Sequence, residues 1–142
     1  MTVVLDDHLL RDWLVRHDEA LVEAVHGEAV ATTNLWYARL CKSAARATGG
    51  ALLAGWRTEE RRALIAGLVG LPDDIIVRPM GLLAWRMGEL VADHTGLSTL
   101  GAEAVASAID LNARVLVSAL DDGPGIRQCC AALSVTYDAL PR

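Results

Sequence analysis

The chain has 142 residues, the usual size of a single domain, and it is long enough to bury a core without a disulfide or a structural metal. Its formal net charge of −5 argues against a protein that holds nucleic acid through a broad basic surface. No stretch approaches the roughly 18 consecutive apolar residues of a membrane span, and no secretory leader pattern opens the chain. We therefore expect a cytoplasmic protein with no membrane partner. Three cysteines without metal-ligand spacing fit small core residues in a reducing compartment: Cys41, Cys129 and Cys130.

The chain is rich in apolar residues, at 53% of the sequence, with a mean hydropathy of +0.31. One interpretation is that a partner, such as a second copy of the chain, covers extra apolar surface. The other is a core built mainly from Ala and Leu. The composition leaves both open.

Five short apolar stretches predict strands, and several are nearly continuous runs of Val, Leu or Ile, as in strands buried on both faces of a parallel sheet. They are Thr2–Leu5, Ala29–Thr33, Ile75–Arg78, Arg114–Ser118 and Val135–Tyr137. Helical patterns lie between them, so the alternation predicts right-handed crossovers. We expect one α/β domain over residues 1–142, a three-layer α/β/α fold with a parallel sheet of about five short strands.

The helical patterns have recognisable start and stop signals. Thr58 precedes two acids in a predicted first turn, Ser98 or Thr99 is placed to cap a later helix, and Pro124 suits the first position of the last helix. The predicted helices begin near Leu9, cover Asp18–Val25 and Leu35–Ala47 (with Gly49-Gly50 as a break), run from Thr58 to Gly70, cover Gly81–Asp93, and then follow Ser98 and Gly123.

Four stretches resemble one known family. They are Val3-Val4-Leu5-Asp6 followed by Leu9-Leu10, Ala31-Thr32-Thr33-Asn34-Leu35, the segment from Leu97 through Gly101-Ala102 to Ala108, and Arg114-Val115-Leu116-Val117-Ser118-Ala119. In this order they are similar to the PIN domain of the VapC ribonuclease toxins, over nearly the whole chain. The resemblance implies a PIN-like fold and a site at the carboxyl edge of the sheet.

The family's chemistry needs three or four carboxylates around Mg²⁺ or Mn²⁺, hard cations that activate water and neutralise phosphate. Asp6 matches the first acid and is the expected metal ligand. The second acid is missing, because no Asp or Glu occurs between Ala29 and Thr58, and Arg39 falls near its position. Gly101 stands where the third acid is expected. Leu120 takes the fourth position, and Asp121 and Asp122 follow it directly.

Each candidate near the first acid has two interpretations. Asp6 is either a metal ligand or the cap of the helix that follows it. Asp7 is expected to face solvent at the helix start. His8 is a base, a ligand or an ordinary polar contact. Arg39 either points at Asp6 and takes the place of the missing cation, or is exposed on its helix. One of the two acids before Gly123-Pro124 is expected to cap the last helix, with a metal role as the alternative.

Further candidates are weaker. Ser118 is a pocket residue through the strand resemblance, while Glu103 and Asp93 are acids that could have replaced the missing ones. Arg39, Lys42 and Arg46 could bind phosphate as a basic strip, although three charges at helical spacing also describe a solvated face. Trp36, Tyr37 and Trp85 are interpreted as packing side chains, with the Trp residues in the core or at an interface.

Three functions remain open. The first is a degenerate PIN-like protein without nuclease activity or cofactor, which acts by binding an antitoxin-like protein and forms a homodimer. The second is an active Mg²⁺- or Mn²⁺-dependent endoribonuclease of the VapC type, with Asp6, Asp121 and Asp122 as catalytic acids and RNA as substrate. The third is an unrelated α/β binding domain, since fold alone does not assign function.

Overall fold

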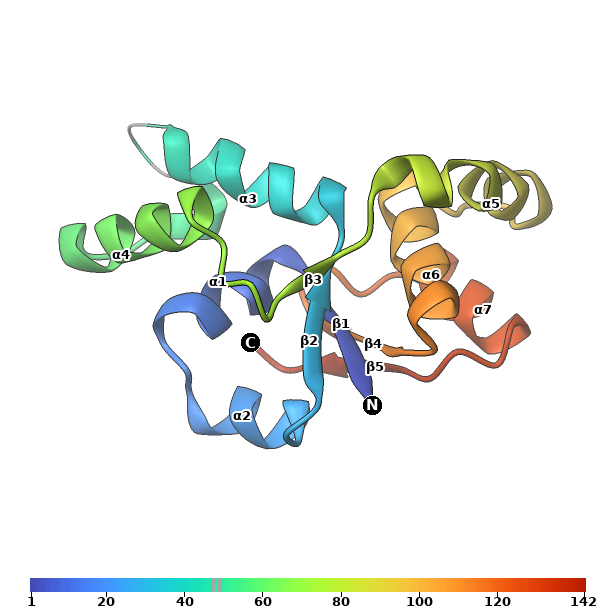
Figure 1. Ribbon diagram of the computed structural model, residues 1–142, viewed down its shortest axis with the longest axis horizontal. Helices are drawn as coiled ribbons and strands as arrows, with labels where there is room; N and C mark the ends of the chain where they lie inside the picture. The colour runs from blue at the N-terminus through green and yellow to red at the C-terminus, as the bar shows by residue number, and fades with distance from the viewer. Residues whose placement is uncertain (47, 49) are drawn as a thin grey trace.

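The computed structural model describes residues 1–46, 48 and 50–142. These residues form seven α-helices, a short 3₁₀ turn over Ala51–Leu53 and one sheet of five parallel strands (Figure 1). The strand order is β3-β2-β1-β4-β5, which confirms the predicted three-layer α/β fold with a five-stranded parallel sheet. The strands are β1 (Thr2–Leu5), β2 (Ala29–Thr32), β3 (Ile76–Val77), β4 (Arg114–Ser118) and β5 (Tyr137–Leu140).

Three predicted strands were too long or displaced, because their ends serve caps and turns instead of the sheet. Thr33 lies outside β2 and caps the following helix, because its side chain accepts a hydrogen bond from the N–H of Trp36. The N–H of Ile75 bonds the carbonyl of Pro72 in a turn. The N–H of Val135 bonds the carbonyl of Cys130 and closes the last helix, so β5 begins two residues later than predicted.

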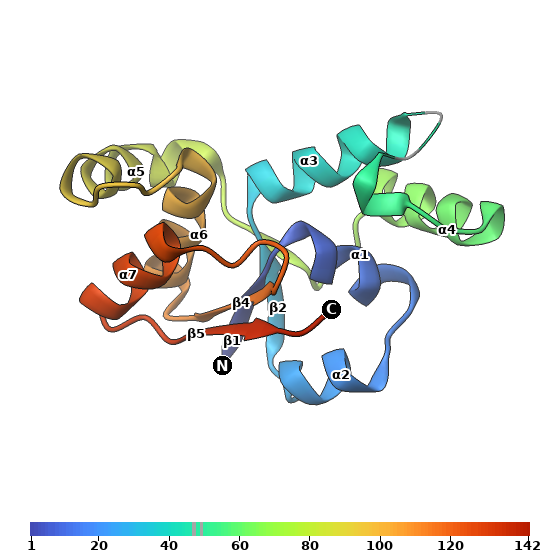
Figure 2. The same ribbon diagram turned by 180° about the vertical axis from the view of Figure 1, so that it is seen from behind.

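Helices cover both faces of the sheet, as Figures 1 and 2 show. One group lies on one side and a second group on the other, and α3 begins above the end of β2 and runs toward α4. The first group is α1 (Asp7–Val15), α2 (Glu19–Val25), α3 (Asn34–Ala45) and α4 (Thr58–Val69), and the second is α5 (Met80–Asp93), α6 (Thr99–Leu111) and α7 (Pro124–Ala132). The predicted helix end at Ala47 and the Gly49 half of the predicted break lie outside the described residues.

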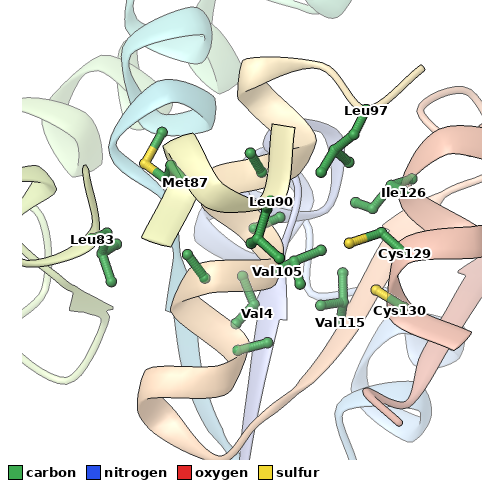
Figure 3. Close-up of a cluster of buried hydrophobic side chains, with 14 of the residues drawn as sticks. Val4, Leu83, Met87, Leu90, Leu97, Val105, Val115, Ile126, Cys129 and Cys130 are labelled. Atoms are coloured by element: carbon green, nitrogen blue, oxygen red, sulfur yellow. The ribbon is translucent and has the colours of Figure 1, made fainter. Parts of the chain in front are cut away.

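The core divides according to the alternation of side chains along each strand. Val4 of β1 faces the cluster that α5, α6 and α7 cover, together with Val105 and Val115 (Figure 3). Val3 and Leu5 face the opposite cluster, which α1 and α2 cover. A third cluster joins α1, α3 and α4 away from the sheet. Strands buried on both faces explain the continuous apolar runs in the sequence.

The order in which the chain adds strands reverses between β1 and β4. The chain adds β2 and β3 on one side of β1 and then crosses over to add β4 and β5 on the other side. In such sheets ligands bind outside the carboxyl ends of the strands at this switch point. Here those ends are Leu5 and Ser118, so Asp6 and the loop after Ser118 meet at this position.

Two remaining expectations about side chains have different outcomes. Trp36 is 2% exposed and packs in the core as predicted, whereas Trp85 is 82% exposed and does not pack in the core. Trp85 lies on the outer face of α5, which turns Leu83, Met87 and Leu90 inward instead. Within the described ranges, no helix combines the length and apolar character needed to cross a membrane.

Candidate functional site

Asp6 ties three elements together at the switch point. It follows β1, is fully buried and caps α1, because its Oδ1 accepts the N–H of Leu9 at 2.9 Å. Its Oδ2 accepts the N–H of Ser118 at 2.8 Å, at the end of β4. Burial raises the pKa of Asp6 well above its usual value, and a hydrogen bond with Asp121 adds to this effect, although the two N–H donors oppose it.

Asp7 is fully buried, so the expectation that it faces solvent was wrong. The helix α3 packs across α1 and places Arg39 over this carboxylate. Arg39 Nη2 donates to Asp7 Oδ1 at 2.9 Å, and Arg39 Nε donates to Asp7 Oδ2. The result is a bidentate pair, the strong geometry for a guanidinium and a carboxylate. Arg39 thus does not point at Asp6 as one interpretation proposed, but at the next residue.

Asp121 completes the cluster from the loop after β4. Its Oδ1 accepts a hydrogen bond from Arg39 Nη2 at 2.8 Å, and its Oδ2 lies 3.0 Å from Nδ1 of His8. Burial alone would raise the pKa of Asp121, but hydrogen bonds with His8, Asp6, Asp7 and Arg39 hold it well below its usual value. Arg39 therefore links α1, α3 and this loop.

His8 is the second cation of the cluster. Its Nδ1 lies 3.0 Å from Asp121 Oδ2 and 3.2 Å from Asp7 Oδ1. Burial alone would lower the pKa of His8, but the hydrogen bonds to Asp121 and Asp7 outweigh burial and raise it to about 9. The imidazole is therefore protonated at neutral pH, and Nδ1 acts as a donor.

Asp6, Asp7, His8 and Asp121 offer ligand atoms that all lie within 4.8 Å of one another, a spacing that could hold a metal ion. The donors around them oppose this use. Every oxygen of the three carboxyl groups already accepts a hydrogen bond from an N–H of the protein. Two cations stand against three acids, one of which has a raised pKa. Mg²⁺, which prefers oxygen ligands in near-octahedral geometry, would therefore have to compete with these donors and with the charge of Arg39 for the carboxylate oxygens.

Two further candidate positions, Glu103 and Gly101, lie beside the cluster without joining it. Glu103 is fully buried and caps α3 from across the core, since its carboxylate accepts the N–H groups of Asn34 and Leu35 at 2.8 Å each. At Gly101 an added Cβ would lie 3.0 Å from Leu97 Cδ1, closer than such atoms normally approach. A side chain at this position would therefore require a small shift of the Leu97 side chain.

The other predicted acids are also elsewhere. Asp122 binds the guanidinium of Arg127 and the hydroxyl of Tyr137, each at 2.8 Å. Asp93 is exposed at the end of α5. The expectation that one of the two acids before Gly123 caps α7 was wrong, because the N-cap residue is Gly123 itself and the two acid side chains bind other partners. The prediction that Pro124 opens this helix is confirmed.

Two cavities flank the cluster, and Asp121 lines both. One, of about 200 Å³, has Trp36 and Gly101 in its wall. The other, of about 330 Å³, has His8 and Arg39. Sequence reasoning missed Trp36 as a neighbour of the site, although its place three residues before Arg39 on one helix was a usable signal. Ser118 contributes its backbone N–H, while its buried Oγ has no hydrogen-bond partner among the described residues.

The geometry defines a class of protein: a three-layer α/β domain with a largely neutralised cluster of acids at its topological switch point. Comparison with known protein families finds no family model that matches this chain. No curated protein matches it either.

Proposed function

We propose that this chain is a PIN-like domain, similar to the VapC toxins, in which metal-dependent ribonuclease chemistry is lost and binding is retained. The order of strands and helices and the acid after β1 support the likeness. The pairing of Arg39 with Asp7 and Asp121, near the expected position of a second acid, supports the loss of activity.

One observation carries this proposal: all the carboxyl oxygens of Asp6, Asp7 and Asp121 accept N–H donors of the protein itself. A divalent ion would have to displace the guanidinium of Arg39 from two carboxylates. It would also approach a fixed positive charge within a few ångströms, where charge repulsion is strong because water screens poorly. The ion gives up its own water reluctantly, so this exchange is unfavourable.

The cluster also lacks a substitute for the metal in activating water. A metal lowers the pKa of bound water so that it reacts near neutral pH. His8 could act as a general base only in its neutral form, and its contacts with Asp121 and Asp7 raise its pKa to about 9. The protonated imidazole has no free site for a proton at pH 7.

The proposal is tested on the unmodified protein by titration calorimetry with MgCl₂ and MnCl₂, together with a cleavage assay on single-stranded RNA. We expect no stoichiometric binding at millimolar ion concentrations and no cleavage that depends on the metal. Binding of one ion that Asp6→Ala abolishes, or cleavage that EDTA stops, would contradict the proposal.

A charge reversal provides a second, positive test. Arg39→Glu places a carboxylate beside Asp7 and Asp121, so the variant should gain a Mn²⁺ site and should melt at a higher temperature with Mn²⁺ than without it. Arg46→Glu at the C-cap of the same helix is the matched control, because this exposed residue belongs to no carboxylate pair among the described residues. A metal response in the control but not in Arg39→Glu would contradict the assigned role of Arg39.

The second candidate function is the active endoribonuclease with Asp6 and Asp121 as ligands. The compact spacing of the four candidate ligand groups favours it. The experiments above separate the two candidates. An antitoxin-like partner and a homodimer belong to the proposed binding role, and the exposed Trp85 on α5 offers a fluorescence probe for either.

A further inference from the structure

We propose that the groove beside the cluster binds a small phosphorylated ligand of about nucleotide size. This inference names a ligand class for the binding role proposed above, and therefore rests on that role. It depends on Lys42 and Arg46, which lie outside the acid cluster.

The groove is a cavity of about 330 Å³, a size that suits a small ligand. One wall is the face of α3 that carries Arg39, Lys42 and Ser43, continued by Arg46, the C-cap residue of this helix. Lys42, Ser43 and Arg46 follow Arg39 by three, four and seven residues, so the four side chains lie along one stripe. The His8 imidazole lines the groove from α1.

Donors along this stripe are available to a ligand. Lys42 and Arg46 make no side-chain hydrogen bond or ion pair with any described residue. Arg39 uses Nε and Nη2 for the two acids, while its Nη1 has no partner within the described part of the chain. A phosphate group, with several charged acceptor oxygens, matches such a set of donors.

The charge balance inside the groove favours an anion. Asp121 is the only carboxylate among the described residues that line it, and that acid already binds Arg39 and His8. Lys42 and Arg46 therefore remain as two positive charges without a counter-ion in the part of the chain that the structure describes. Asp7 and Asp121 do not neutralise these two charges, because they pair with Arg39 and His8.

A small ligand fits these observations better than a polynucleotide. The chain carries a net charge of −5, and a polynucleotide needs a basic path that follows many phosphates. The Lys and Arg side chains that line the groove all come from α3 and its C-cap residue, so the basic surface is as short as the cavity. The cavity holds roughly one nucleotide and not a strand.

Titration calorimetry with ADP, pyrophosphate and inorganic phosphate at about 50 mM NaCl tests the inference. We expect ADP to bind with a Kd on the order of 0.1 mM, and to bind about tenfold more weakly near 200 mM NaCl because salt screens the charges. Lys42→Ala and Arg46→Ala should each weaken binding about threefold to tenfold. Arg86→Ala on α5, across the sheet, removes an equal charge and should leave binding unchanged.

Three results would overturn the inference. The first is no binding of any of the three compounds at about 5 mM, a limit far above the expected Kd. The second is equal affinity of the Lys42→Ala and Arg46→Ala variants and the parent protein. The third is tighter binding of a ten-nucleotide RNA without terminal phosphate, which would assign the groove to a polymer. Each leaves the metal experiments untouched, so a failure here is distinct from a failure of the proposed loss of nuclease activity.

Discussion

Replacing Arg39 by Met probes the central contact of the site. The change keeps the length and apolar stem of the side chain but removes the guanidinium that binds Asp7 and Asp121. Asp7 is fully buried, so its charge loses its main partner in a place that water does not reach. Asp121 keeps only His8 as a cationic partner.

The magnitude follows from what remains around Asp7. Removing one member of a buried pair costs about 3–5 kcal/mol, because the other charge is left unpaired. The Arg39 side chain is 38% exposed, and Asp7 keeps the N–H of His8 at 2.9 Å, so we expect a loss near the lower end. A loss of about 3 kcal/mol in the free energy of unfolding corresponds to about 10 °C in Tm for a domain of this size.

Urea unfolding at pH 7 measures this loss as a shift of the midpoint at unchanged slope. Arg46→Met at the C-cap of the same helix is the control and should stay within about 0.5 kcal/mol of the parent. In a double-mutant cycle with Asp7→Asn, the two changes should couple by about 1 kcal/mol or more. A loss below about 0.5 kcal/mol, or additive effects in the cycle, would refute the assigned pair.

Three further predictions concern residues around the cluster. The folded-state pKa of His8, about 9, lies above its ordinary 6.5, so its contribution to stability is complete below pH 6.5 and is lost as the pH rises through 9. Between pH 6.5 and 9 the parent protein should lose on the order of 2 kcal/mol of its free energy of unfolding, and His8→Gln should not show this loss. NMR titration of the imidazole should give the pKa of His8. Glu103→Ala should cost about 2–4 kcal/mol and speed amide exchange at Asn34, because α3 loses its buried cap. Gly101→Val should lower the free energy of unfolding, measured with urea, by about 1–3 kcal/mol through crowding, whereas Gly88→Ala, with open space around it, should raise it by about 0.5–1 kcal/mol.

The strands could be predicted where continuous apolar runs forced burial on both faces. Val3, Val4 and Leu5 are all fully buried, so the pattern of the run was sufficient. At the edge of the sheet the same reasoning failed, because Val135 resembles a strand residue while its N–H closes α7. Short edge strands depend on which neighbour takes the backbone hydrogen bonds, and that choice is made by the tertiary structure.

The site was predictable in its location and only partly in its contacts. An acid at the end of β1 and another after β4 must meet in a parallel sheet with this strand order, and Asp6 and Asp121 do so. The burial of Asp7 was not predictable, because the first turn of a helix is exposed unless another helix crosses it. The crossing of α3 over α1 is a long-range contact, and it also decides that Arg39 reaches Asp7 and not Asp6.

The single position of Arg39 connects the two proposals. A carboxylate there would leave the neighbouring acids with an unbalanced negative charge, which a divalent ion could neutralise. The guanidinium neutralises them without an ion, and its third nitrogen, Nη1, stays without a partner among the described residues of a wall that also carries Lys42 and Arg46. On the two proposals, the guanidinium that neutralises the cluster also makes the adjoining groove attractive to anions. Arg39→Glu should accordingly lose ADP binding and gain a Mn²⁺ response in one variant, and a change in only one of these properties would show that the two are separate.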